Sequence, residues 1–84
     1  MSQFNPSFSQ ESITKAIINS LPDAFVEIKD MTGTGDHLEI CVTSPSFAGK
    51  LLFEQHQVVM KALSNEFAKG LHAVKLHTKI PHQS

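Results

Sequence analysis

Residues 24–43 read AFVEIKDMTGTGDHLEICVT, and this stretch carries the clearest structural pattern in the chain. Apolar and polar residues alternate over 24–29 and again from Leu38 to Val42, which is the period-two pattern of strands with one buried face. Between these segments, residues 30–36 are rich in Gly and Thr and supply turn chemistry. The stretch therefore predicts a β-hairpin with its apolar side chains on one face.

Helical patterns flank this hairpin on both sides. Upstream, Ser9 is a candidate N-cap, and apolar residues recur at helical spacing as far as Pro22, which predicts a helix over about 10–20. Downstream, an apolar stripe at helical spacing predicts one or two helices, a short one and a longer one, after Gly49. The members of that stripe are Leu52, His56, Val59, Leu63 and Phe67.

A third strand is predicted over 71–78, where Val74 and Leu76 alternate with Lys75 and His77. About 26 residues separate it from the second strand, and a helical crossover of that length normally joins parallel strands. The expected order is α-β-β-α-α-β. This is an α+β fold in which helices cover one face of a three-stranded mixed sheet.

The composition describes one small globular domain. The chain has 84 residues, of which 40% are hydrophobic, and we expect a folded domain over 9–81 between tails at 1–8 and 82–84. Its net charge is −1, and every basic residue other than His is Lys, which argues against a dedicated nucleic-acid binder. Neither a secretory signal nor an apolar run of roughly 20 residues is found, so the expected location is cytoplasmic, with no membrane association.

The chain contains five histidines, which are the candidate metal ligands. If the second and third strands are parallel neighbours, their starting ends meet, and His37 and His72 lie at the same end of the sheet. Two imidazoles from converging segments are donors that a borderline metal prefers. His56 fits the apolar side of a helix as a partly buried residue, whereas His77 and His82 fit a solvated face and a tail.

Two histidines alone leave a zinc or iron site incomplete. Cys41 stands four residues beyond His37, roughly 13 Å along a regular strand, so the two cannot bind one ion. Asp36 offers an oxygen, although its usual role in such a loop is to bond the turn backbone. The missing ligands are therefore expected from a partner. No paired carboxylates, phosphate loop or activated nucleophile favours an enzyme.

Three stretches together resemble the BolA-like family over roughly residues 10–81. They are DMTGTGDH at 30–37, FAGK at 47–50 with His56 and Val58 following, and LHA at 71–73 continuing to Thr78 and Pro81. The resemblance implies a fold like that of class II KH domains. It also implies a monothiol glutaredoxin as partner, with a 2Fe-2S cluster shared between a glutaredoxin cysteine, glutathione and this chain. The family's histidine of the third strand falls on His72, and His37 is the best match for the second ligand.

The function expected from this resemblance is that of an adaptor in iron-sulfur cluster trafficking or iron homeostasis, monomeric or weakly dimeric when alone. Because histidine binds a metal only when neutral, cluster contact is expected to loosen at low pH. The alternative is a KH-like nucleic-acid-binding transcriptional regulator with weak DNA binding. KH domains clamp the backbone with a G-x-x-G loop, and this chain has none. Departures from the family pattern include Gln55 and Gln57, which flank His56 where relatives often have Arg.

Overall fold

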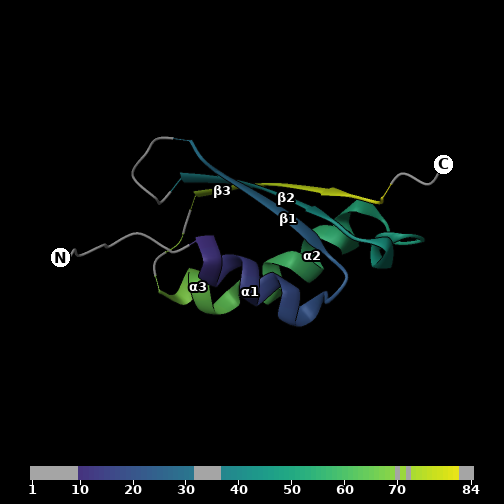
Figure 1. Cartoon of the computed structure of the whole chain (residues 1–84), viewed down its shortest axis with the longest axis horizontal. Coiled ribbons are helices and arrows are strands. Elements are labelled where there is room, and N and C mark those ends of the chain that lie inside the picture. Colours follow the sequence, from purple (N-terminus) through teal and green to yellow (C-terminus); the bar gives the residue numbers. More distant parts are fainter. Residues whose placement is uncertain (1–9, 32–36, 70, 72, 82–84) are drawn as a thin grey trace.

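A computed structural model describes residues 10–31, 37–69, 71 and 73–81, and it arranges them in two layers. Three strands form one sheet, and the helices cover one face of it (Figure 1). The elements follow the predicted order. They are α1 (Gln10–Ser20), β1 (Phe25–Asp30), β2 (His37–Thr43), the short 3-10 helix η1 (Pro45–Phe47), α2 (Leu52–Ala62), α3 (Ser64–Ala68) and β3 (Ala73–Lys79).

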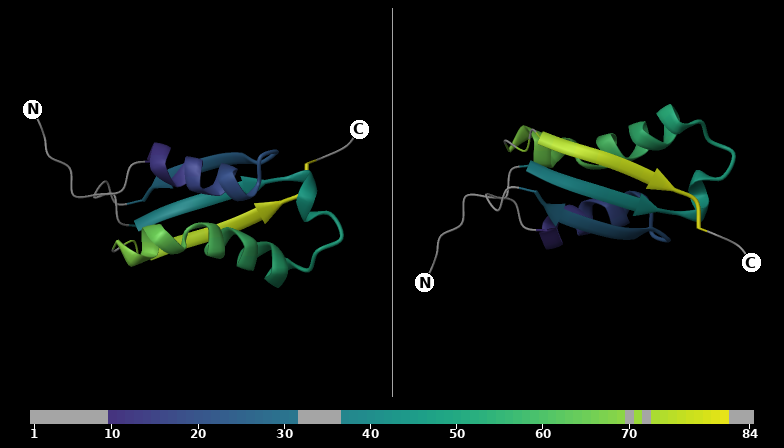
Figure 2. Two further views of the ribbon diagram at one scale, coloured as in Figure 1. Left: turned by 90° about the horizontal axis from the view of Figure 1, so that it is seen from below. Right: turned by 90° about the horizontal axis from the view of Figure 1, so that it is seen from above.

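The sheet has the strand order β1-β2-β3 and is mixed, as predicted. β1 and β2 are antiparallel, with Ile28 opposite Ile40, and the backbone N–H of Met31 donates to the carbonyl of His37 over 2.9 Å. β2 and β3 are parallel neighbours, with Ile40 opposite Leu76. Both views in Figure 2 show β2 between the other two strands. The crossover through α2 and α3 therefore returns the chain beside the strand it left.

The hydrophobic core lies between the sheet and the helices. Its buried members come from α1, from alternate positions of β2, from η1 and α2, and from the connecting segments. They are Ile13, Ile17, Leu21, Leu38, Ile40, Val42, Phe47, Val59, Leu63 and Leu71. Val26 and Ile28 of β1 are half-buried against this cluster. The predicted alternation is thus confirmed, and the odd positions of β2 face away from the helices.

The helical region differs from its prediction in two ways. The long helix α2 precedes the short helix α3, and they are separated at Leu63, whose N–H bonds back to the carbonyls of Val59 and Met60. Leu52, expected in the buried stripe, is 60% exposed at the start of α2, and Gln55 is buried instead. The helical periodicity predicted the helix correctly, but it did not predict that the Leu52 side chain at its start would be exposed. The predicted cap Ser9 lies outside the described residues.

Buried polar groups join the ends of these elements. Gln55 connects α2 to β3, because its amide oxygen accepts from Thr78 Oγ1 over 2.7 Å and its amide nitrogen donates to the carbonyl of Lys50 over 3.0 Å. Glu66, also buried, has its carboxylate 3.7 Å from the ammonium of Lys69. Satisfying these groups matters because an unpaired polar group in the interior destabilises the fold.

A second polar cluster closes the end of β2. The hydroxyl of the fully buried Ser44 donates to Asp23 over 2.8 Å, and that of Ser46 donates to the same carboxylate over 3.0 Å. Ser44 Oγ also accepts the backbone N–H of Ser46 over 3.0 Å. The hydrogen bond from Ser44, followed by that from Ser46, lowers the pKa of Asp23 below its ordinary value of 3.8.

This lowered pKa predicts an acid-dependent loss of stability. The ionised Asp23 stabilises the fold fully above the ordinary pKa of 3.8, and that contribution is lost as pH falls through the lower pKa of the folded state. Urea midpoints measured from pH 7 to pH 2 should therefore fall less steeply for Asp23→Asn than for the wild type. Ser44→Ala should cost about 1–2 kcal/mol at pH 7, since it removes a buried bonded hydroxyl. The matched variant Ser46→Ala, at an exposed position, should cost less, and equal losses would contradict this account.

Candidate metal centre at one end of the sheet

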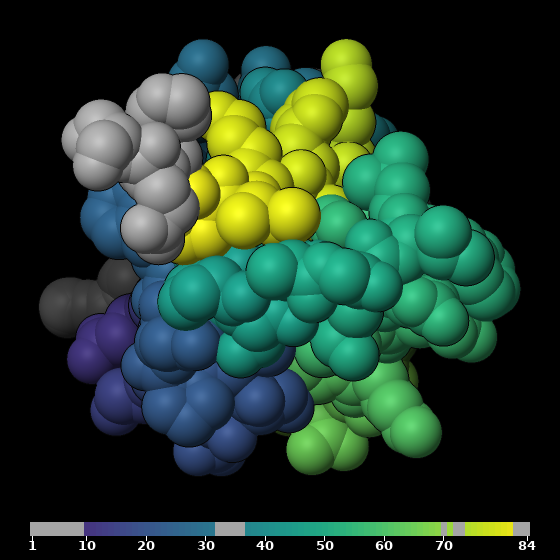
Figure 3. Space-filling view, turned by 90° about the vertical axis from the view of Figure 1, so that its right-hand side faces the viewer, coloured from purple at the N-terminus to yellow at the C-terminus, as the bar shows by residue number. Residues whose placement is uncertain are grey.

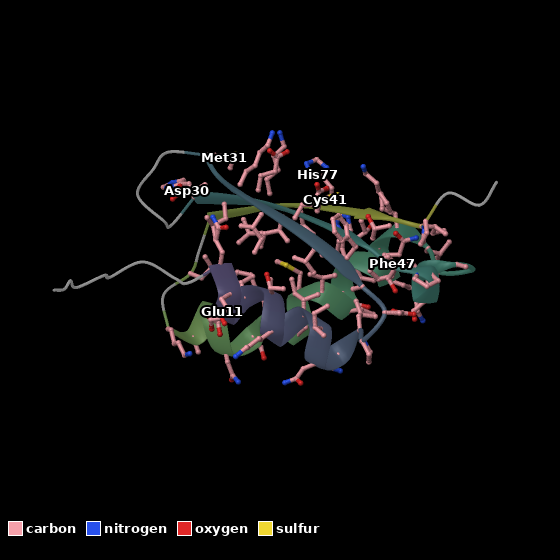
Figure 4. The ribbon with its side chains drawn as sticks, viewed as in Figure 1. Glu11, Asp30, Met31, Cys41, Phe47 and His77 are labelled. Carbon is pink, nitrogen blue, oxygen red and sulfur yellow. The ribbon has the colours of Figure 1, made fainter. Side chains whose placement is uncertain are left out.

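The starting ends of β2 and β3 lie side by side, as the candidate site requires. In the parallel register, His37 is the partner of Ala73, the first residue of β3. Because the prediction that these ends meet depended on the two strands being neighbours, the observed strand order confirms its premise. Asp30 and Met31, labelled in Figure 4, mark the same end of the sheet, where β1 stops.

His37 is the described member of the predicted ligand pair. It is exposed and occupies an odd position of β2, so its side chain belongs to the sheet face that carries no helix. An exposed imidazole at a strand terminus is accessible to a group held by another molecule. Its position is fixed because its carbonyl closes the hairpin by accepting from Met31.

His72, the other predicted ligand, lies outside the described residues. What the register establishes is the position of Ala73, which follows His72 in the sequence and sits opposite His37. The assignment of His72 as a ligand therefore stays a prediction. So does that of Asp36, which also falls outside the described part of the chain.

Cys41 is separate from this end of the sheet. It lies on the same face as His37 but four positions along β2, where its register partners are Glu27 on β1 and His77 on β3. The thiol is free and half-buried. The inference that Cys41 and His37 do not share one ion agrees with this spacing, since regular strand geometry is kept through all of β2.

His77 has a partner that the sequence patterns did not identify. Its Nε2 lies 2.8 Å from Glu39 Oε2, across the boundary between β2 and β3. The expectation of a solvated residue is correct for exposure, at 45% for the side chain, but the ring is not isolated. Figure 4 shows His77 on the face of the sheet opposite the helices. Only the parallel register could have revealed this pair, because residues 39 and 77 lie far apart in the sequence.

His56 lies on α2 and is half-buried, as expected. The hydrogen bonds at this point of the helix are made by its neighbour Gln55, which faces the sheet. Gln55, one of the departures noted in the sequence, thus joins β3 to the segment before α2. Gln57, the second departure, is exposed.

The described residues do not enclose a metal ion by themselves. Across residues 10–31, 37–69, 71 and 73–81, no three His, Cys, Asp or Glu side chains are grouped so that they could hold one. His37 therefore suits a metal group that brings other ligands with it, rather than an ion enclosed by the described part of this chain. For the same ranges, no helix combines the length and hydrophobicity needed to cross a membrane.

These features define a class: a small α+β domain with one open sheet face and a histidine at the end where two parallel strands begin. The family model described as BolA-like protein matches residues 10–83. The chain therefore belongs to the BolA-like family. The fold and the resemblance read from the sequence are both confirmed by this match.

Individual relatives agree with the assignment. The uncharacterized protein RP812 of Rickettsia prowazekii is 33% identical over 70 residues, covering 83% of this chain and 91% of the relative. Its solution structure has a TM-score of 0.71 at 31% identity, covering 89% and 97% of the two chains. Protein BOLA2 of Arabidopsis thaliana is 32% identical over 69 residues, covering 81% and 73%. The DNA-binding transcriptional regulator BolA of Vibrio cholerae is 29% identical over 76 residues, covering 82% and 72%.

Proposed function

We propose that this chain is a cytoplasmic adaptor that binds a monothiol glutaredoxin and supplies His72 and His37 as ligands to a shared 2Fe-2S cluster. It acts in iron-sulfur cluster trafficking or iron signalling without catalytic turnover. The observation that carries the proposal is the parallel register that sets His37 opposite the first residue of β3, directly after His72 in the sequence. Membership of the BolA-like family supports the choice of partner.

The ligand count also supports a shared cluster. A 2Fe-2S cluster takes four protein or small-molecule ligands, two on each iron. Two imidazoles from this chain leave two positions, which a glutaredoxin cysteine and glutathione would fill with thiolates. Imidazole in place of thiolate lowers the negative charge of the cluster and raises its reduction potential, as in Rieske centres. Of these two ligands, His37 is among the described residues: it is exposed, and the hydrogen bond that closes the hairpin holds its backbone at the end of the sheet where β2 and β3 begin.

Mixing the chain with a cluster-loaded monothiol glutaredoxin tests the proposal. A 1:1 complex should form and be resolved by gel filtration, and its visible absorption and circular dichroism should differ from those of the glutaredoxin alone, because histidine ligation changes the electronic environment of the iron. The control is the same mixture made with glutaredoxin that lacks the cluster. If the visible spectra of the loaded mixture equal the sum of the separate components, the proposal is wrong.

The second candidate is a nucleic-acid-binding regulator, which the name of the Vibrio cholerae relative favours. Against it stand the net charge of −1 and the absence of Arg from the chain. Filter binding of duplex DNA at 50 and 200 mM salt separates the candidates. If the chain made six or more phosphate contacts, the rise from 50 to 200 mM salt would weaken DNA binding by roughly a thousand-fold. We expect no saturable binding at either salt concentration.

A further inference from the structure

The strand β1 forms one edge of the sheet, and its outer side faces away from β2. Among the described residues, β2 pairs with it on one side and no strand lies on the other (Figure 2). The N–H of Met31 donates to the carbonyl of His37 in the hairpin register, and hydrogen-bonded pairs alternate along antiparallel strands. The odd residues of β1 therefore bond to β2, whereas the backbone groups of Val26 and Ile28 point outward. Such an edge is a template for pairing with another strand.

The residues that β1 carries on the open sheet face have a symmetric order. They are Phe25, Glu27 and Lys29, followed by Met31, so the order is apolar, acidic, basic, apolar. Phe25 and Met31 are 63% and 49% exposed. Glu27 and Lys29 are exposed and form no ion pair within the described part of the chain. When this order is read backwards, as in an antiparallel partner, it sets unlike charges opposite each other and apolar residues opposite apolar ones.

One register of two antiparallel β1 strands satisfies this pattern. With Ile28 opposite its counterpart, Glu27 faces Lys29 of the second copy on both sides of the two-fold axis, and Phe25 faces Met31 at each end. The outward backbone groups of Ile28 then bond to each other across the axis. A shift of two residues in either direction sets Glu27 against Glu27 or Lys29 against Lys29. A shift of one residue sets the open face of one copy against the helix face of the other.

The other edge strand, β3, lacks this complementarity. Lys75, His77 and Lys79 share its open face and are all basic residues, so two antiparallel β3 strands would oppose like residues. Lysine on an edge strand is a common protection against unwanted pairing. Figure 3 looks onto the end where β1 begins and shows the blue residues of this segment on the left side of the molecule, with α2 on the right. Self-pairing is therefore favoured at β1.

The helix α1 lies beneath β1 and would come beside its counterpart in such a pair (Figure 1). The hydroxyl of Ser12 donates to Glu66 of α3 over 3.5 Å, so this side of α1 faces the other helices. Thr14 and Ile18 lie about 200° and 240° further round the helix, on the side towards the outer edge of β1. Both are half-buried. Ile18 thus adds apolar surface beneath the paired strands.

We propose that β1 pairs antiparallel with β1 of a second copy, with Ile28 at the two-fold axis, and that the two sheets become one continuous sheet. The contact of one strand and one helix side per copy is smaller than a standard interface of roughly 800 Å² per partner, so the dimer is weak. A two-fold pairing is closed and stops at two chains. The inference concerns the chain alone and does not depend on cluster binding.

Analytical ultracentrifugation of the full chain, without iron or glutaredoxin, tests this inference. Between roughly 10 µM and 1 mM the mass should rise from one chain towards two and no further. Lys29→Glu should weaken the dimer by about ten-fold or more, because it sets acidic residues opposite each other on both sides of the axis. Lys75→Glu is the matched control. It changes the net charge equally and lies on the same sheet face, but on β3, and it should dimerise like the wild type.

Three further measurements separate strand pairing from a general effect of charge. The double variant Glu27→Lys with Lys29→Glu exchanges the two charges and should dimerise like the wild type. An equimolar mixture of the two single variants should form a heterodimer, because the basic strand of one chain then faces the acidic strand of the other. Amide hydrogen exchange at Val26 and Ile28 should slow as the wild-type concentration rises, since their N–H groups enter the new ladder.

Four outcomes would overturn the inference. A chain that stays monomeric to about 1 mM would leave the edge of β1 for a strand of a different protein. Equal loss of the dimer in Lys29→Glu and Lys75→Glu would place the contact elsewhere. Masses beyond two chains would indicate head-to-tail pairing of β1 with β3. A charge-exchanged double variant that keeps the circular dichroism of the folded chain but stays monomeric would refute the register.

Discussion

The variant His72→Ala is expected to abolish the visible absorption and circular dichroism of the mixed complex with cluster-loaded glutaredoxin. The proposed cluster takes its thiolates from the partner and its imidazoles from this chain, so removing the better-assigned imidazole leaves one iron with an open position. His37→Ala is expected to have a smaller effect, because a water or a neighbouring side chain can replace an exposed ligand at the end of the sheet. Both variants are measured by visible spectroscopy after gel filtration.

His77→Ala is the matched control for these histidine variants. His77 is exposed on the same sheet face, but it pairs with Glu39 and lies opposite Cys41, away from the end where β2 and β3 begin. The complex containing His77→Ala should keep the wild-type spectrum. An unchanged spectrum for His72→Ala would refute the ligand assignment, and loss of the spectrum in all three variants would show that the effect is not specific to the proposed site.

Phe47→Ala should cost about 3–5 kcal/mol of the free energy of unfolding, the typical cost of truncating a buried Phe. Phe47 is 0% exposed and belongs to the core from its position in η1, the 3-10 helix that closes one end of the molecule (Figure 4). A domain of this length has a total stability of only about 4–13 kcal/mol. The variant is therefore expected to be partly or wholly unfolded at 37 °C, as measured by urea and thermal denaturation.

Two substitutions calibrate this measurement. Phe47→Leu keeps most of the volume and should cost about 1–2 kcal/mol, between the wild type and Phe47→Ala. Phe25→Ala removes a ring that is 63% exposed and should change stability by less than about 1 kcal/mol. If Phe47→Ala also cost under about 1 kcal/mol, the assignment of Phe47 to the core would be wrong.

Local periodicity was sufficient to predict which side chains of a strand are buried. The alternation at Leu38, Ile40 and Val42 predicted the buried face of β2 because successive side chains of any strand point to opposite faces. It was insufficient at Leu52, which has the helical spacing of the buried stripe but is 60% exposed at the start of α2. The position of a helix end relative to a sheet depends on the connection before it, here the turn at Gly49.

Two of the polar pairs that the patterns missed join residues distant in the sequence. Asp23 and Ser44 meet because β1 and β2 are antiparallel, which places the start of β1 beside the end of β2. Glu39 and His77 meet because β2 and β3 are parallel. No local signal marks either pair, since each depends on the register of a sheet that forms only when the crossover is complete.

By itself the sequence determined the element order, the buried faces of the strands and the family, because period-two and helical patterns and short motifs are local properties of the chain. It also restricted the candidate ligands to His37 and His72. Only the tertiary structure decided that β2 and β3 are neighbours, that Gln55 rather than Leu52 is buried, and that His77 of β3 pairs with Glu39 of β2. These features depend on long-range packing, which places elements relative to one another and which no local spacing specifies.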